Sequence, residues 1–224
     1  MKRYLLISLI IFCTFTVSAQ KTNFSTPDYK KISKAISKPG SLTFYSELMA
    51  RYRAHDTTLS PSEYHLLYYG YSLQAEYAPY THQPYADSLM ALVRKESISA
   101  GQYSRILEFA NAVLEKSPFD MRYLDPMIYV YQMQGNTEMA EKLEFKLGRI
   151  IETIFSSGDG LTEKTAFHVI SVSHEYDLIR ALGFGFGGEQ SLSNGKVDLL
   201  KVEANDYGIN GMYFNISALS NAQK

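Results

Sequence analysis

The sequence predicts a mainly α-helical protein, built of tetratricopeptide-like antiparallel helix pairs and followed by a small C-terminal antiparallel β unit. Three observations lead to this prediction. Apolar residues recur at helical spacing over about residues 29–155. Within that region, residues 87–120 and 121–154 can be laid out as two 34-residue frames. From residue 156 onward, glycine becomes dense and β-branched residues rise.

The first nineteen residues have the layout of a secretory signal peptide. Lys2 and Arg3 give a basic start, an apolar run follows, and Ala19 ends a stretch of small residues. The apolar run of about thirteen residues is shorter than the roughly 20 residues of a membrane-spanning helix, so we expect cleavage after Ala19 rather than a retained anchor. Phe12 argues against lipid attachment at Cys13, because a small residue normally precedes that cysteine. We therefore expect residues 1–19 to be a signal peptide and the protein to be exported, periplasmic or secreted.

The composition of the mature chain excludes several classes of function. Cleavage leaves 205 of the 224 residues and removes the single cysteine, so no disulfide, thiol nucleophile or cysteine-based zinc site is expected. Without Lys2 and Arg3, the 22 basic residues become 20, against 23 acidic residues, a net charge of −3. This balance does not favour nucleic acid or an anionic membrane as a partner. At this length, burial of a sizeable core in one or two domains is expected.

Helix signals divide residues 27–155, which we treat as one helical repeat-like domain. The first helix begins near Pro27 and ends before Pro39-Gly40. The clearest start is Ser60-Pro61-Ser62-Glu63, a capping box from which a helix should run to about Tyr77. The other helices are expected at roughly residues 43–54, 85–99, 102–117 and 137–155, with a shorter one that ends near Gln134.

The two 34-residue frames resemble tetratricopeptide repeats. Gly101 and Gly135 occupy the same place in the two frames, and Ala140 stands where the second helix of a repeat approaches its neighbour. Arg94 departs from the pattern, since a small residue is usual at its position. An unrelated bundle of antiparallel helices is the alternative.

Residues 156–220 are expected to form a small β-rich unit that packs on the last helices. Strands are expected over residues 166–172, 197–203 and 212–216, and a short helix over residues 175–182. Asn194-Gly195 favours a type I′ hairpin turn, because both residues tolerate the positive φ that this turn requires.

Five short segments carry a family resemblance. They are Asp56-Thr57-Thr58-Leu59, Leu67-Tyr68-Tyr69-Gly70, Gly158-Asp159-Gly160, His174-Glu175-Tyr176-Asp177 and Gly211-Met212-Tyr213-Phe214-Asn215-Ile216. Together they resemble an uncharacterised secreted family of Bacteroidetes-type bacteria, domain of unknown function 4919. The match would cover about residues 27–217. The family implies no activity, so the resemblance does not assign a function.

Three familiar catalytic or cofactor patterns are incomplete. Residues 183–188 satisfy G-x-G-x-x-G, but a strand and a turn are expected to follow, whereas a dinucleotide site needs a helix there. His174 begins a zinc-protease-like segment, but Leu178 stands where the second histidine is required. A Gly-x-Ser-x-Gly elbow is missing. We expect no cofactor and no metal; a site that combines His168 and His174, on the same face of one strand, is the alternative.

Tyrosines are concentrated between residues 64 and 85. Tyr64, Tyr68 and Tyr71 share a helical face through their i, i+4, i+7 spacing, a stripe that more often packs against another helix than binds a ligand. In the tetratricopeptide register, however, six residues fall where that family lines its concave groove. These candidate binding residues are Tyr64, Tyr71, Arg122, Asp125, Tyr129 and Gln132.

A modification site is also predicted. Asp56-Thr57-Thr58 resembles the acceptor pattern for O-glycosylation in Bacteroidetes-type bacteria, and it falls in an expected exposed loop. Thr57 is therefore the candidate acceptor. Asp87-Ser88-Leu89 fits the same pattern but is better explained by an acidic residue in the first turn of a helix.

These observations favour a non-enzymatic exported protein that binds a peptide or another protein in the bacterial envelope. We expect no nucleic-acid partner and no transmembrane segment after cleavage. The alternative is an extracytoplasmic enzyme or glycan-binding protein, with its site at the junction between the helices and the β unit. An acid pair or a histidine cluster in a deep cleft would favour that alternative, whereas a shallow tyrosine-lined groove would favour the binding protein. A structural envelope protein without a small ligand is a third reading.

Overall fold

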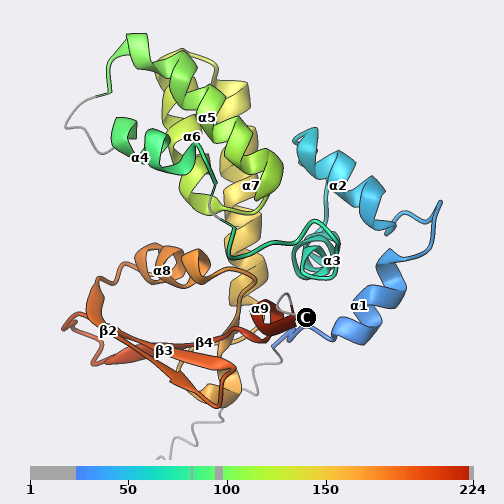
Figure 1. The fold of residues 1–224 in the computed structure, drawn as a ribbon, viewed down its shortest axis with the longest axis vertical. Helices are drawn as coiled ribbons and strands as arrows, with labels where there is room; N and C mark the ends of the chain where they lie inside the picture. The colour runs from blue at the N-terminus through green and yellow to red at the C-terminus, as the bar shows by residue number, and fades with distance from the viewer. Residues whose placement is uncertain (1–23, 82, 94–97, 222–224) are drawn as a thin grey trace, which may run out of the picture.

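The computed structural model describes residues 24–81, 83–93 and 98–221. The expected signal peptide, residues 1–19, lies outside these ranges. Within them the chain forms nine α-helices and, towards the C-terminus, a four-stranded mixed sheet (Figure 1). The predicted mainly helical class with a small C-terminal β unit is therefore confirmed. Among the described helices, none is both long and apolar enough to span a bilayer.

The first three helices, α1 (Tyr29–Ile36), α2 (Tyr45–Arg53) and α3 (Pro61–Tyr71), lie together at the right of Figure 1. The predicted capping box at the start of α3 is confirmed. Ser60 Oγ accepts from the Glu63 amide at 3.3 Å, and Glu63 Oε2 accepts from the Ser60 amide at 2.8 Å. The helix ends before the predicted Tyr77, because the next amides bond three residues back in tight turns.

Four helices form the upper part of the molecule in Figure 1: α4 (Ala86–Val93), α5 (Tyr103–Lys116), α6 (Leu124–Met133) and α7 (Thr137–Phe155). Each packs on the next in sequence. The bounds of α5 and α7 agree with the predicted ranges, whereas α4 is described only as far as Val93, so Arg94 lies outside the described residues. This successive packing is typical of helix pairs, and their assignment as tetratricopeptide repeats stays a prediction.

The turn between α6 and α7 agrees with the predicted start of the helix over residues 137–155. Gly135 has a φ of 74°, which glycine adopts without steric cost. Asn136 then accepts from the Met139 amide through its side chain at 3.2 Å, so it caps the first turn of α7.

The sheet is mixed rather than purely antiparallel. Its order is β1 (Phe167–His168), β4 (Gly211–Asn215), β3 (Val197–Val202) and β2 (Phe186–Ser193). The last three strands pair antiparallel as predicted, but β1 runs parallel to β4. A parallel pair needs a crossover connection, and the chain supplies it by leaving β1 through helix α8 (Val172–Ala181) before it enters β2.

Two local expectations for this unit have different outcomes. The hairpin between β2 and β3 has positive φ at Asn194 (53°) and Gly195 (64°), so the type I′ turn is confirmed. The predicted strand over residues 166–172 is too long, because Ser171 caps α8 through a hydrogen bond from the Ser173 amide. The helix therefore starts earlier than the predicted residue 175.

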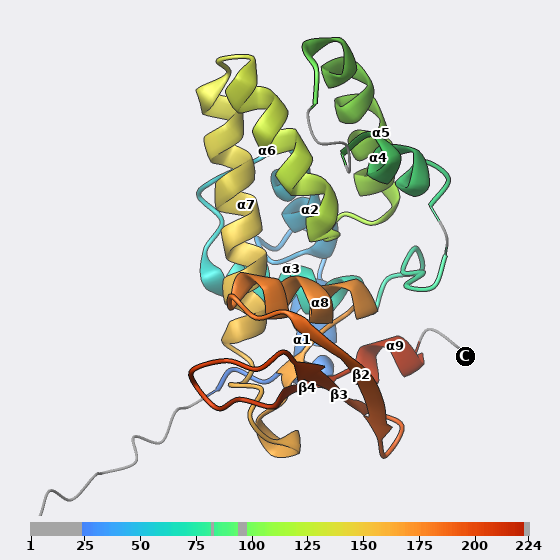
Figure 2. The same ribbon diagram turned by 90° about the vertical axis from the view of Figure 1, so that its left-hand side faces the viewer.

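The helices and the sheet share one cluster of buried apolar side chains. Helix α7 passes from the upper helices down to the sheet, and α8 lies between them (Figure 2). Leu67, Leu124, Ile150, Leu178 and Phe214 are almost fully buried and belong to the same cluster. The described parts of residues 27–155 and 156–220 are therefore joined by a common core. The chain also forms the short 3-10 turns η1 (Ala100–Gln102), η2 (Met121–Tyr123) and η3 (Glu163–Thr165), and ends in α9 (Ser217–Asn221).

The tyrosines on and near α3 act mainly as packing residues. Tyr64, Tyr68 and Tyr69 are almost fully buried, and their rings lie edge-on to other aromatic rings. Tyr69 and three nearby tyrosines also donate hydrogen bonds from their hydroxyls to backbone carbonyls, which phenylalanine could not do. Tyr52 donates to Pro118 O at 2.7 Å, Tyr69 to His168 O at 3.2 Å, Tyr71 to Lys116 O at 2.8 Å and Tyr77 to Ile170 O at 2.7 Å.

Candidate functional site

A cavity of about 1050 Å³ lies between the upper helices and α8, and we call it the junction cleft. Its lining comes from residues 77–81, from α4, from residues 117–126 and from α8. In Figure 1, α8 lies below α4 and α6 across this space. Small-molecule pockets typically measure about 300–1,000 Å³, so the cleft is large enough for a short peptide or an oligosaccharide.

Apolar side chains form much of the cleft wall. They include Tyr71 at the end of α3, Tyr77 beyond it, Met90 on α4, Tyr123 just before α6 and Leu147 on α7. Tyrosine offers a large apolar face together with a polar tip, so such a wall can bury a chain of mixed polarity.

A bidentate ion pair is fixed at the start of α6. Arg122 donates from Nε to Asp120 Oδ1 at 2.9 Å and from Nη2 to Asp120 Oδ2 at 2.7 Å. Its guanidinium carbon also lies 5.4 Å from the centre of the Tyr123 ring. Hydrogen bonding to Asp120 raises the pKa of Arg122, and this fork geometry holds its positive charge in one place.

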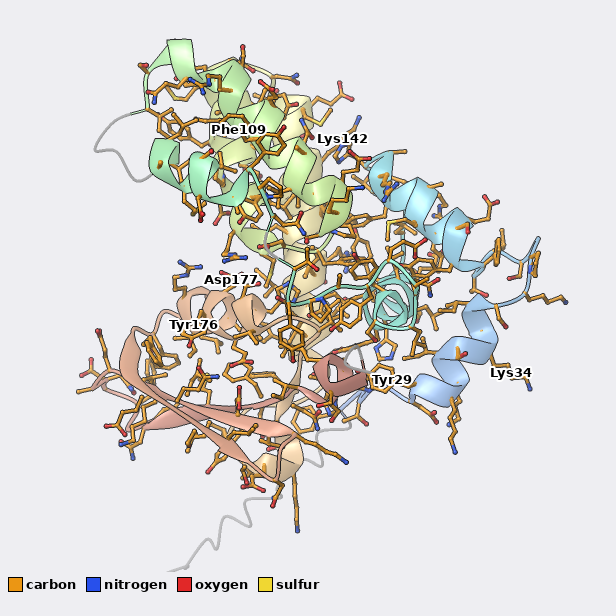
Figure 3. All side chains as sticks on the ribbon, in the orientation of Figure 1. Tyr29, Lys34, Phe109, Lys142, Tyr176 and Asp177 are labelled. Carbon is orange, nitrogen blue, oxygen red and sulfur yellow. The ribbon has the colours of Figure 1, made fainter. Side chains whose placement is uncertain are left out.

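Asp177 on α8 is the most unusual charged residue in the cleft. Its side chain is only 8% exposed, and Oδ1 accepts from Nη2 of Arg180, one turn further along the helix. Oδ2 is buried and has no hydrogen-bond partner among the residues that the structure describes. Burial raises the pKa of Asp177 to about 6, and the nearby Arg180 opposes this shift. Figure 3 shows Asp177 on the side of α8 that faces the upper helices, whereas Tyr176 lies towards the sheet.

Among the described residues, acidic side chains outnumber basic ones in the lining. Burial also raises the pKa of Asp125, again opposed by Arg180. Apart from Asp87, which has an interaction of its own, the described lining holds three carboxylates and two guanidinium groups, so these five groups carry one net negative charge when all are ionised. The five residues are Asp120, Asp125, Asp177, Arg122 and Arg180.

His174 lines the cleft but is held as a neutral packing residue. Its Nδ1 lies 2.7 Å from the hydroxyl of Tyr68, and the ring is almost fully buried. Burial lowers the pKa of His174 to about 4. The alternative metal site required His168 on the same strand, but His168 belongs to β1 and His174 to α8. Among the described residues, no three histidine, cysteine or acidic side chains are grouped so that they could hold a metal ion.

A second pair of acids lies on the other side of α8, against the sheet. Glu175 and Asp198 are both buried, and Gln190 donates from Nε2 to Asp198 at 2.7 Å and to Glu175 at 3.5 Å. Burial, together with the nearby Asp198, raises the pKa of Glu175 to about 9. Because Glu175 is protonated at neutral pH and lies outside the cleft lining, we assign this pair to the packing of α8 on the sheet.

The structure separates the six predicted binding residues into three groups. Tyr71, Arg122 and Asp125 line the junction cleft. Tyr129 and Gln132 are exposed further along α6, where Gln132 donates to Glu144 at 2.8 Å. Tyr64 is 1% exposed and packs against Tyr52 and Phe145, so it does not line a groove.

Sequence reasoning missed Asp120, Asp177 and Tyr77 as cleft residues. The last two lie far apart in the chain, and the fold alone brings them to one cavity. The family-like segment from His174 to Asp177 is the sequence signal that lies on α8, and neither its partial zinc-protease pattern nor the alternative metal site with His168 indicates a cleft.

The predicted glycosylation site is accessible. Thr57 is exposed in the loop between α2 and α3. The neighbouring Asp56 accepts from Thr58 at 2.8 Å through the amide and at 2.6 Å through the hydroxyl, so Thr58 is already engaged. Modification of Thr57 stays a prediction.

The comparisons with known proteins give one match. A family model described as Domain of unknown function (DUF4919) matches residues 30–224, which confirms the resemblance inferred over about residues 27–217. No curated protein and no solved structure matches the chain.

Proposed function

The chain belongs to the DUF4919 family, whose description names no activity, and we propose that it is an exported protein that binds a peptide, or a segment of another protein, in the junction cleft. The observation that supports this most is the cavity itself. It combines a volume of about 1050 Å³ with aromatic walls and fixed charges, which is the usual composition of a binding site.

The arrangement of groups suits binding better than a specific reaction. Arg122 and Asp120 neutralise each other in a fixed pair, and His174 is neutral and bonded to Tyr68. The Arg122–Asp120 pair and His174 are therefore not available to transfer a proton. Export is proposed from the sequence, because the first nineteen residues have the composition of a signal peptide.

An enzyme or a glycan-binding protein is the second candidate. It is favoured by the position of the cleft at the junction of helices and sheet, and by two carboxyl groups there, Asp125 and Asp177, whose pKa values are raised. A raised carboxyl pKa is a common property of general acids. Hydrolysis or binding of oligosaccharides that is lost in Asp177→Asn would favour this candidate over peptide binding.

Site-specific photocrosslinking tests the proposed function. A benzophenone amino acid at Ala91, an exposed residue of the cleft lining, should crosslink to a polypeptide in the envelope of the producing cell. The control position is Lys34, which is exposed on α1 and lies far from the cleft in Figure 3. Crosslinks from both positions, or from neither, would contradict binding in the cleft.

A further inference from the structure

We propose that Asp177 is the recognition site for an ammonium or guanidinium group of the bound peptide, and that Arg180 occupies this carboxylate until the ligand displaces it. This inference rests on the proposed function and names the ligand chemistry of the same cleft. It follows from the hydrogen bonding of Asp177, the exposure of Arg180 and the charge of the lining.

The hydrogen bonding of Asp177 is incomplete. An ionised carboxylate accepts several hydrogen bonds, but from the described residues Asp177 receives one, from Arg180 on Oδ1, and Oδ2 receives none. A buried acceptor without a partner is unfavourable, and more so when it is charged. Asp177 therefore has acceptor capacity that the described residues do not use, and a ligand cation with two or more N–H groups would fill it once the side chains that bury Oδ2 move aside.

The present partner of Asp177 is replaceable. The Arg180 side chain is 68% exposed, and the pair is formed within one helix at i,i+3 spacing. Only the Arg180 end of the pair is exposed, so its guanidinium can return to water, and holding this long side chain in one place costs conformational entropy. Arg122 is different, because two hydrogen bonds to Asp120 and the Tyr123 ring fix it. The cation that a ligand displaces is therefore Arg180.

The charge of the lining favours a cationic ligand. Apart from Asp87, which has an interaction of its own, the described lining holds three carboxylates and two guanidinium groups, and this balance favours a positively charged ligand. If the ligand cation takes the place of Arg180 on Asp177, the guanidinium of Arg180 is released to solvent. The proposed exchange therefore keeps Asp177 paired at every stage.

An ammonium group could come from a peptide or from an amino sugar, and we commit to a peptide. The aromatic and aliphatic wall formed by Tyr71, Tyr77, Met90, Tyr123 and Leu147 suits alternating apolar and basic side chains. Oligomers of glucosamine carry the same ammonium group without apolar side chains. Comparing their affinity with that of a basic peptide therefore distinguishes an amino sugar from a peptide as the ligand.

Titration calorimetry of the mature chain with defined probes tests the proposal at pH 8, where Asp177 is ionised. The probe is acetyl-Leu-Arg-Leu-Arg-Leu-amide, and its control is the same peptide with citrulline in place of arginine, which keeps the shape and removes the charge. We expect measurable binding of the arginine peptide, at least about tenfold weaker binding of the citrulline peptide, and weaker binding of glucosamine pentamer. Equal affinity for the arginine and citrulline peptides would overturn the proposal, and tighter binding of the glucosamine pentamer would overturn the choice of a peptide.

Variants of Asp177 and Arg180 distinguish displacement of Arg180 by the peptide from a general attraction of the peptide to the negatively charged cleft. Asp177→Asn should weaken the arginine peptide at least tenfold, whereas Arg180→Ala should tighten it several-fold because the competing cation is gone. Asp125→Asn removes one negative charge from the same cleft and should change affinity by less than about threefold. In the Asp177→Asn background, Arg180→Ala should have no further effect. If Asp125→Asn and Asp177→Asn weaken the affinity for the arginine peptide equally, the cleft attracts cations through its overall charge, and the specific role of Asp177 is overturned.

The two proposals fail in different ways. If the arginine peptide does not bind but the benzophenone at Ala91 still crosslinks to a polypeptide, the role of Asp177 and Arg180 is refuted and binding in the cleft survives. If the peptide binds with unchanged affinity in Asp177→Asn, the cleft binds peptides by another group and the assignment to Asp177 is wrong.

Discussion

The turn after α7 sets the position of the sheet against the helices, and Gly158 is the residue that permits it. A Cβ atom at this position would lie 2.3 Å from the carbonyl oxygen of Thr165 and 2.6 Å from that of Ala166. Both oxygens belong to backbone, so no side-chain rotation relieves the contact. The amides of Asp159 and Gly160 also bond to Thr165 O, at 3.0 and 2.8 Å, and hold it in place.

We therefore expect Gly158→Ala to destabilise the protein by about 3 kcal/mol. Overpacking of this kind typically costs about 1–3 kcal/mol, and each hydrogen bond to Thr165 O that is lost costs about 1 kcal/mol more. Alanine also lowers the conformational entropy of the unfolded chain, which offsets only about 0.4–1 kcal/mol of this destabilisation. Because this turn joins α7 to the sheet that supports α8, the substitution should also alter the cleft.

Gly148 provides the matched control. It lies within α7, and a Cβ there would meet no atom within 4 Å. Gly148→Ala should therefore stabilise the protein by about 0.5–1 kcal/mol through helix propensity alone.

Urea unfolding followed by circular dichroism distinguishes the two substitutions. With a slope near 3 kcal/mol per molar urea, the midpoint should fall by about 1 M in Gly158→Ala and rise by about 0.2–0.3 M in Gly148→Ala. An unchanged midpoint in Gly158→Ala would refute the close packing of this turn.

Three further predictions concern the packing of α7, the burial of Glu175 and the start of the mature chain. Ala140 is buried where α7 meets α6, so Ala140→Phe should cost about 1–3 kcal/mol, whereas the exposed Glu138→Gln should stay within about 0.5 kcal/mol, as measured by denaturant midpoints. The folded pKa of Glu175, about 9, lies above its unfolded value, so between about pH 4.5 and 9 the folded state holds the extra proton and stability falls as pH rises. Glu175→Gln should therefore melt at a higher temperature than the parent at pH 8 and at a similar temperature at pH 4. Mass spectrometry of exported material should show cleavage after Ala19, and an intact Met1 would contradict the signal peptide.

Features with a local physical cause could be predicted from the sequence. The capping box of Ser60 and Glu63 depends on four consecutive residues, and the turn at Asn194 depends on two. The bounds of α7 followed from a regular apolar spacing after the turn at Gly135. In each case the interactions that determine the structure lie within one turn of the chain, so no knowledge of the fold was needed.

Features decided by distant parts of the chain were missed. The parallel pairing of β1 depends on the crossover through α8, which the apolar pattern of residues 166–172 did not reveal. Tyr64 has the spacing of a groove residue, but packing of α3 against α2 and α7 buries it. Asp177 is a candidate site residue because the fold brings α8 and residues 120–126 to the same cavity.

The central claim is that the junction cleft binds a basic peptide, and a single indole can report this directly. The chain contains no tryptophan, so Ala91→Trp places the only indole on the cleft wall, and Lys34→Trp places it on the distant face of α1. On titration with acetyl-Leu-Arg-Leu-Arg-Leu-amide, we expect a saturable blue shift of the emission in Ala91→Trp and none in Lys34→Trp. An emission that stays constant in Ala91→Trp, or that changes equally in both variants, would contradict binding in the cleft.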